Sequence, residues 1–373
     1  MKRLPFLRFL CLFAAFSSLV RADDGYRLWL RYDRIHDEAV RSAAAARVQA
    51  IRIALPAPSD SATLAAARSE LALGLHGLLG VAPRIQQITA DAPAALGSEG
   101  YALRRDGDAI VISARTDLGI LYGAFALLRQ IQTGQSPDAL NLTSTPRIQR
   151  RILNHWDNLN GTVARGYAGG SLWNWFTLPD WVDPRLTDYA RACASVGING
   201  AVLTNVNANA RFLTPQMLEK TAAIAATFRP YGIRVYLTAR FSAPVEIGGL
   251  KTADPLDPAV RAWWKATADS IYGYIPDFGG FLVKANSEGQ PGPQDYQRTH
   301  ADGANMLADA LAPHGGIVMW RAFVYSHEEP DDRAKQGHQE FAPLDGQFRP
   351  NVVVQVKNGP IDFMPREPVH PLF

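Results

Sequence analysis

The chain has 373 residues, of which 47% are hydrophobic and 20% charged, an ordinary globular composition that allows a sizeable core and two domains. It has no low-complexity run and no internal repeat, which excludes a disordered or solenoid protein. The formal net charge of +3 falls to −1 once the four basic residues among the first 22 are set aside, so the net charge gives no indication of nucleic-acid binding.

The first 22 residues are typical of a secretory signal peptide. A basic start precedes the apolar stretch 10–20, and the small side chains expected before a cleavage site are Val20 and Ala22. The apolar stretch is too short for a permanent membrane span, and the leucine before Cys11 does not fit a lipoprotein cleavage box. We therefore expect cleavage after Ala22, export to the periplasm or the medium, and no membrane anchor.

Residues 23–147 are expected to form a small α/β domain. The alternation in Tyr26–Tyr32 favours a strand, and further elements are predicted to begin with a strand at Ile51–Ile53, followed by a helix over 61–79, a strand over 109–113 and a helix over 117–132. The Ser-, Thr- and Pro-containing segment 137–146 is interpreted as a linker.

Residues 148–373 alternate strands with helices, which predicts parallel strands joined by right-handed crossovers. The predicted strands are Arg151–His155, Ile198–Thr204, Ile233–Ala239, Gly279–Lys284, Gly316–Trp320 and Asn351–Lys357. The predicted helices are 183–196, 214–229, 258–272, 294–311 and 331–341, with acidic residues near the start of the last one. Six strands are too few for a closed eight-stranded barrel, so an open sheet or an incomplete (β/α)₈ barrel is expected.

Cysteine and histidine usage argues against a disulfide or a metal site. Cys193 is the cysteine that remains after the signal segment, and its place in a helical pattern predicts a small core residue. The eight histidines are scattered without paired ligand spacing, so we expect neither metal nor cofactor.

Polar side chains crowd the carboxyl ends of the predicted strands, where the active sites of (β/α)₈ barrels lie. These residues are Asn154–Asn158, Thr204–Asn207, Lys284, Asn286, Glu288, Trp320, Arg321, Lys357, Asn358 and Asp362. Tryptophan stacking and amide hydrogen bonds from Asn205 and Asn286 suit a carbohydrate, and two carboxylates on separate strands suit glycoside hydrolysis. Lys284, Arg321 and Lys357 together favour an acidic sugar.

Each of these residues has a plainer interpretation when taken alone. Trp156 is more often a core residue than a stacking platform, by roughly two to one, because tryptophans are highly buried on average. Glu288 by itself would usually be solvated, and Arg321 would usually pair with a neighbouring acid. The catalytic hypothesis therefore rests on convergence at several strand ends.

The same segments resemble the family-67 glycoside hydrolases, the α-glucuronidases of xylan breakdown. The matching stretches run through the whole barrel portion: Ile152–Asn158, Arg165–Gly169, Asn205–Ala208, Val283–Gly289, Met319–Tyr325 and Val354–Phe363. The first domain is similar to the α/β domain that precedes the barrel in this family and in β-hexosaminidases.

The resemblance implies an inverting hydrolase without metal that removes glucuronic acid, or its 4-O-methyl ether, from glucuronoxylan-derived xylo-oligosaccharides. It makes Glu288 the general acid and Asp362 one of two carboxylates on the general-base side. It also implies that Lys284, Arg321 and Lys357 hold the sugar carboxylate and that Trp156 stacks on the ring.

The resemblance also implies two further barrel strands, the second base-side carboxylate and a dimer-forming C-terminal domain beyond Phe373. We therefore expect an N-terminal fragment, and residues 23–373 alone are expected to be poorly soluble and without measurable turnover, because open sheet edges leave backbone groups unpaired. The alternatives are an inactive fragment or carbohydrate-binding module and a β-hexosaminidase-like glycosidase. Ser287 before Glu288 weakens the second alternative, which expects adjacent Asp-Glu carboxylates.

Overall fold

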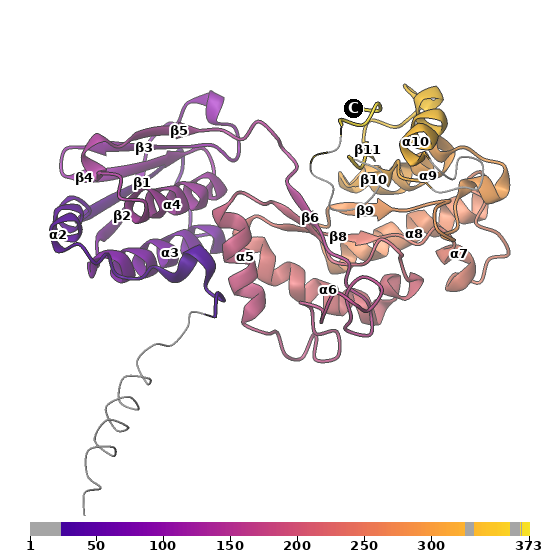
Figure 1. Ribbon diagram of the computed structural model, residues 1–373, viewed down its shortest axis with the longest axis horizontal. Coiled ribbons are helices and arrows are strands. Elements are labelled where there is room, and N and C mark those ends of the chain that lie inside the picture. The colour runs from indigo at the N-terminus through magenta and orange to yellow at the C-terminus, as the bar shows by residue number, and fades with distance from the viewer. Residues whose placement is uncertain (1–23, 325–331, 359–365, 367) are drawn as a thin grey trace, which may run out of the picture.

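The computed structural model describes residues 24–324, 332–358, 366 and 368–373. Two sheets organise this part of the chain: a five-stranded mixed sheet near the N-terminus and a six-stranded parallel sheet after it (Figure 1). The small α/β domain and the incomplete barrel expected from the sequence are both confirmed, the second as a curled half-barrel.

The first sheet has the strand order β2-β1-β4-β3-β5, with β1 parallel to β2 and β4, and β3 antiparallel to β4 and β5. Its strands are β1 (Ala50–Leu55), β2 (Arg84–Thr89), β3 (Tyr101–Asp106), β4 (Ala109–Ala114) and β5 (Asn141–Ser144). The helices of this domain are α2 (Glu38–Arg47), α3 (Ala62–Leu79) and α4 (Asp117–Gln132), with 3₁₀ turns at Leu28–Arg31, Ala94–Leu96 and Pro137–Ala139. Helices α3 and α4 cover one face of the sheet and share its apolar core (Figure 1).

Two expectations for this domain are wrong. Residues Leu28–Arg31 form a 3₁₀ turn instead of a strand, and Trp29 of this turn docks on the barrel, where its indole donates to Ser195 Oγ at 2.8 Å. The segment interpreted as a linker contains β5, since residues 141–144 pair with β3 and extend the first sheet.

The second sheet has its strands in chain order, β6 to β11, and every neighbouring pair is parallel. The strands are β6 (Ile152–Asn154), β7 (Gly200–Val202), β8 (Arg234–Thr238), β9 (Gly280–Val283), β10 (Ile317–Arg321) and β11 (Val352–Gln355). Sequential order, with a helical connection between successive strands, gives the curled half-barrel of Figure 1.

Helices cover the convex face of this sheet. They are α5 (Arg185–Ser195), α6 (Pro215–Phe228), α7 (Ala243–Glu246), α8 (Pro258–Tyr274), α9 (His300–Leu311) and α10 (Arg333–Phe341), with 3₁₀ turns at Ala210–Leu213, Arg229–Tyr231, Pro293–Tyr296, Ala312–His314 and Ala342–Leu344. The large apolar core lies between these helices and the outward strand residues, and Cys193 of α5 is buried in it as expected. The predicted helix over 294–311 is split, because Gln297 adopts a left-handed conformation before Thr299 caps α9.

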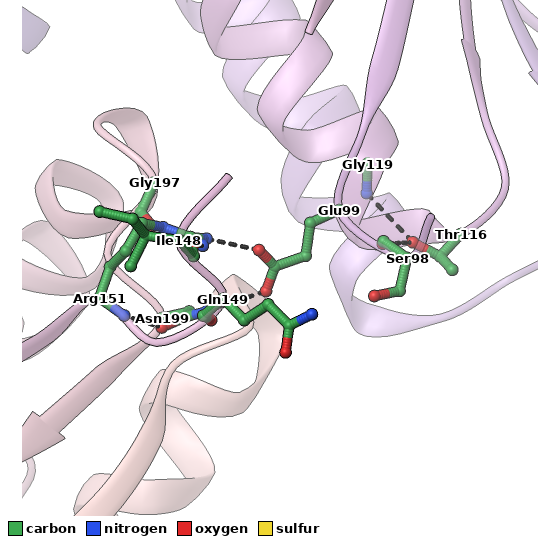
Figure 2. A network of polar contacts seen from close by, with 9 residues as sticks. All are labelled: Ser98, Glu99, Thr116, Gly119, Ile148, Gln149, Arg151, Gly197 and Asn199. Carbon is green, nitrogen blue, oxygen red and sulfur yellow. Dashed lines mark hydrogen bonds and ion pairs between the residues drawn. The ribbon is translucent and has the colours of Figure 1, made fainter. Parts of the chain in front are cut away.

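Glu99 connects the two domains (Figure 2). It lies just before β3, and its carboxylate accepts hydrogen bonds from the Arg151 guanidinium and, at 2.9 Å, from Asn199 Nδ2. The Asn199 side-chain oxygen accepts from the Arg151 backbone at 2.9 Å. Arg151 and Asn199 lie at the entrances of β6 and β7, so this network holds the two strands whose other ends carry Trp156 and Asn205.

A second network lies between α3 and α5. The buried carboxylate of Glu70 accepts two hydrogen bonds from the Arg191 guanidinium, at 2.8 and 2.9 Å, and one from the Tyr32 hydroxyl at 2.7 Å. A buried carboxylate is tolerated when its charge and its lone pairs are both satisfied, as they are here. The first domain is therefore an integral support of the barrel rather than a loosely tethered module.

Gly280 at the start of β9 leaves no room for a side chain. Its φ is +131°, and an added Cβ would lie 1.9 Å from the backbone oxygen of Ile317 on the neighbouring strand. We expect Gly280→Ala to lower the free energy of unfolding by about 3 kcal/mol, measured by urea denaturation. Gly273→Ala in α8 is the matched control: its Cβ meets nothing within 4 Å, so stability should rise by about 0.5–1 kcal/mol. Equal effects of the two changes would contradict this account of β9.

Candidate active site

The period of two along each strand decides which side chains meet inside the half-barrel. The inward core at the concave face consists of Val202, Val206, Tyr236, Leu282, Ile317 and Met319, with the partly buried Ile152, Trp156 and Val353 packed against it. Continuing the alternation past each strand end brings Trp156, Lys284, Arg321 and Lys357 onto this same concave side. Four of the predicted site residues therefore converge because they share one phase of the strand repeat.

A cavity of about 760 Å³ opens at these strand ends. Its floor and walls come from the ends of β6, β10 and β11 and from the loop that follows β6. The predicted residues Trp156, Arg321 and Lys357 line it, and so do His155, Asp157 and Tyr167. The volume is in the range of small-molecule sites and is large enough for a sugar.

Glu288 lies in a cluster of cations, close enough to Arg321 of the cavity wall for the charge of Arg321 to act on it. Its Oε2 accepts a hydrogen bond from Lys284 Nζ, and its Oε1 lies 3.0 Å from Arg165 Nη2. Lys284 is almost wholly buried, with 3% of its side chain exposed, whereas 35% of the Glu288 side chain is exposed. Lys284 Nζ also donates to Asn207 Oδ1 at 2.8 Å, so the end of β7 helps to hold the charge in place.

These neighbours shift the pKa of both members of the pair. Partial burial acts to raise the pKa of Glu288, but the hydrogen bond from Lys284 and the charges of Lys284, Arg165 and Arg321 outweigh burial and lower it. Burial lowers the pKa of Lys284, and the charges of Arg321 and Arg165 act in the same direction, against the stabilising contact with Glu288. The contact with Lys284 and the neighbouring cations thus favour the ionised form of Glu288.

Arg321 and Lys357 share one aromatic ring. Lys357 Nζ lies 3.6 Å from the centroid of the Phe323 ring, and Arg321 Cζ lies 5.9 Å from it. A cation above an aromatic face is attracted by the quadrupole of the ring. Phe323 therefore helps to keep two like charges close together at the cavity wall, which suits an anionic ligand.

The loop after β6 is fixed by Asp157 and two asparagines. The buried Asp157 carboxylate accepts from the Ser171 hydroxyl and, at 3.0 Å, from the Leu172 backbone. Asn158 Nδ2 and Asn205 Nδ2 each donate to the Ala164 oxygen at 2.9 Å. The loop residues that follow are thus held over the strand ends by side chains of the barrel itself.

His155 lies in the cavity wall as a neutral side chain. Burial lowers its pKa to about 4, and its Nε2 is 2.6 Å from the Tyr189 hydroxyl. His155 therefore adds no positive charge to the site near neutral pH.

The structure separates other predicted residues from the cavity wall. Asn205 is buried and its amide is used within the loop network. The Asn286 amide bonds to Asp295 and to the Gln294 backbone, so it braces the following loop. Trp320 is wholly buried on the convex side and donates to His300, which corrects the expectation that it reaches the mouth. Asp362 lies outside the described residues.

Sequence reasoning missed the roles of Arg165, Phe323 and Tyr167. Arg165 and Tyr167 lie in a loop between predicted elements, where no periodicity gives their direction. Phe323 follows β10 by two residues and shares the inward phase of Arg321, so the strand repeat could have indicated it. Tyr167 is 78% exposed at the cavity rim.

Within the described part of the chain, no group of three His, Cys, Asp or Glu side chains is arranged to hold a metal ion. No helix there is both long enough and apolar enough to cross a bilayer.

Comparison with known proteins gives close matches along the whole chain. The sequence is 42% identical to probable α-glucuronidase A of Aspergillus terreus, over 100% of this chain and 47% of that protein. It is 40% identical to α-glucuronidase A of Emericella nidulans and to that of Aspergillus tubingensis, over 98% and 96% of this chain. The chain spans about half the length of these curated relatives, 47% and 45% respectively for the last two.

Solved structures support the fold at low sequence identity. CpGH84D aligns with a TM-score of 0.55 at 10% identity, over 84% of this chain and 53% of that one. A GH138 enzyme that targets pectin rhamnogalacturonan II aligns with a TM-score of 0.52 at 16% identity, over 82% of this chain and 38% of that one.

Family models identify both parts of the chain. Residues 28–127 match the glycosyl hydrolase family 67 N-terminus, and residues 130–373 match the glycosyl hydrolase family 67 middle domain. The two matches meet within the last turns of α4 and together leave only the first 27 residues and a two-residue gap unmatched. The chain belongs to glycosyl hydrolase family 67.

Proposed function

We propose that the whole protein containing this chain is an inverting α-glucuronidase. Its substrates would be glucuronoxylan-derived xylo-oligosaccharides, from which it releases D-glucuronic acid or the 4-O-methyl ether. The observation that carries the proposal is the placement of Arg321 and Lys357 in the cavity wall, close to the Lys284–Glu288 ion pair, because cations at a sugar site suit an acidic sugar. The names of the family relatives support the same activity.

Binding would use the cations and the tryptophan. The three cations offer charge-assisted hydrogen bonds to the carboxylate at C6 of the sugar, which fixes the ring in one orientation. Trp156 packs on the inward core and lines the cavity, which supports the proposal that its ring stacks on the sugar.

The chemical step would be a single displacement. Glu288 in its protonated form gives its proton to the glycosidic oxygen as the bond from that oxygen to the anomeric carbon breaks. A water attacks the anomeric carbon from the opposite face, and its proton passes to a base-side carboxylate, for which we propose Asp362. The products are the xylo-oligosaccharide and glucuronic acid of inverted configuration.

The test is a ¹H NMR time course of the whole protein acting on aldotriouronic acid. We expect the β-anomer of glucuronic acid to appear first and the α-anomer to follow by mutarotation. Initial α-anomer would contradict inversion, and no release of glucuronic acid would contradict the proposed activity. We also propose export of the protein, for which N-terminal sequencing of the secreted form should begin at Asp23.

A further inference from the structure

Glu288 is held by cations from two different parts of the chain. Lys284 belongs to the segment that follows β9, whereas Arg165 belongs to the loop after β6, 123 residues before Glu288 in the sequence. Each carboxylate oxygen therefore has a cation of its own. Such a carboxylate is stabilised in the ionised form, yet a general acid must carry a proton before it can act.

The position of Arg165 is built into the loop. Ala164, the residue before it, has a φ of +57°, a backbone conformation that is energetically unfavourable for any residue other than glycine. The backbone of Ala164 is fixed at both ends: its N–H donates to the Trp156 oxygen at 2.8 Å, and its oxygen accepts from Asn158 and Asn205. Although 63% of the Arg165 side chain is exposed, the backbone next to it is held in position, so its guanidinium can reach Glu288.

We propose that Arg165 is a specificity-determining residue, which with Lys284 keeps Glu288 as an ion-paired carboxylate until the acidic group of the sugar engages these cations. Glu288 then takes up a proton from the solvent, and it is this proton that it donates to the leaving oxygen. Since the ligand is the uronic acid of the proposed function, this inference rests on that function and deepens it. A neutral glycoside of the same shape would bind without promoting the protonation of Glu288.

The charges around Glu288 support this sequence of events. The ionisable groups that affect it are Lys284 from its own segment, Arg165 from the loop after β6, and Arg321 from β10. Burial alone would raise the pKa of Glu288, and these three cations together lower it. A substrate carboxylate placed among the same cations offsets their field, so the pKa of Glu288 rises when an acidic sugar binds.

The pH dependence of turnover should show this coupling. A general acid loses activity as the pH rises through its pKa; kcat/KM reports that pKa in the ligand-free protein, and kcat reports it in the complex. We therefore expect the alkaline limb of kcat to lie at higher pH than the alkaline limb of kcat/KM.

A direct test follows the Glu288 carboxyl by NMR in the whole protein labelled with ¹³C at the glutamate carboxyls, with Glu288→Gln identifying the resonance. Saturating glucuronic acid should move its titration to higher pH, and glucose should leave it unchanged. In Arg165→Gln the titration of the ligand-free protein should already lie at higher pH. Arg165→Lys keeps the charge and should resemble the wild type.

Activity gives a second readout of the same variants. In Arg165→Gln the ratio of kcat/KM for the glucuronide to that for the matching α-glucoside should fall about tenfold. The control Arg349→Gln, whose side chain pairs with Asp309 away from the cavity, should leave the ratio unchanged.

The inference is overturned if Arg165→Gln changes neither the titration nor the ratio, or if glucuronic acid and glucose affect Glu288 alike. The two proposals fail separately: absence of any glucuronic acid release contradicts the proposed function, whereas the titration of Glu288 needs no turnover.

Discussion

Glu288→Gln should remove almost all release of glucuronic acid from aldotriouronic acid but far less of the activity on an aryl α-glucuronide. A glutamine cannot give a proton to the leaving oxygen, and general acid catalysis contributes about 10²–10⁴-fold in rate. A xylosyl leaving group needs that proton, whereas a phenolate with a low pKa leaves without it. Initial rates on the two substrates measure the difference.

The substitution preserves the shape of the site. Glutamine is close in size to glutamate, and its amide oxygen can still accept from Lys284 or Arg165. Glu219→Gln, an exposed change on α6, is the matched control and should leave both rates unchanged. Equal losses on the natural and the aryl substrate would remove Glu288 from the acid role.

Arg321→Ala should depress hydrolysis of the glucuronide far more than hydrolysis of the matching α-glucoside. A charge-assisted hydrogen bond to a carboxylate contributes about 1.5–3 kcal/mol, so kcat/KM for the glucuronide should fall about 10- to 150-fold. The neutral glucoside lacks the carboxylate and loses only the effects of packing around Phe323. Steady-state kinetics on both substrates provide the comparison.

The position of Arg321 makes this test informative. It ends β10 on the concave side and lines the cavity, and its guanidinium lies near the ring of Phe323. Arg349→Ala, on an exposed arginine, is the matched control for loss of one positive charge. Similar losses of kcat/KM for the glucuronide and the glucoside would mean that Arg321 supports the strand end and does not bind the carboxylate of the sugar.

The barrel portion was readily predicted because buried parallel strands give short apolar runs bounded by glycine or polar residues. Five of its strands lie within the predicted ranges, and β10 extends one residue further, to Arg321. The first domain was harder to predict. Its strand β2 is half exposed, and β5 is polar and short, so neither has a distinct apolar pattern. Both exist because neighbouring strands offer backbone partners, which no local pattern reveals.

The candidate site was predictable in part for the same reason. Strand ends were located well enough to select Lys284, Arg321 and Lys357, but Arg321 and Trp320 were given equal weight although adjacent residues face opposite sides of a sheet. Arg165 could not be derived from periodicity, because a loop with left-handed residues has no repeat. Its contact with Glu288 depends on the asparagines that anchor Ala164.

The most direct test of the central claim is a crystal structure of the whole protein with Glu288→Gln and bound aldotriouronic acid. We expect the sugar carboxylate to lie within hydrogen-bonding distance of Lys284, Arg321 and Lys357, the Trp156 ring to stack on the glucuronic acid, and the glycosidic oxygen to face residue 288. A uronic acid whose carboxylate points to solvent, or a ligand bound away from these strand ends, would contradict the account.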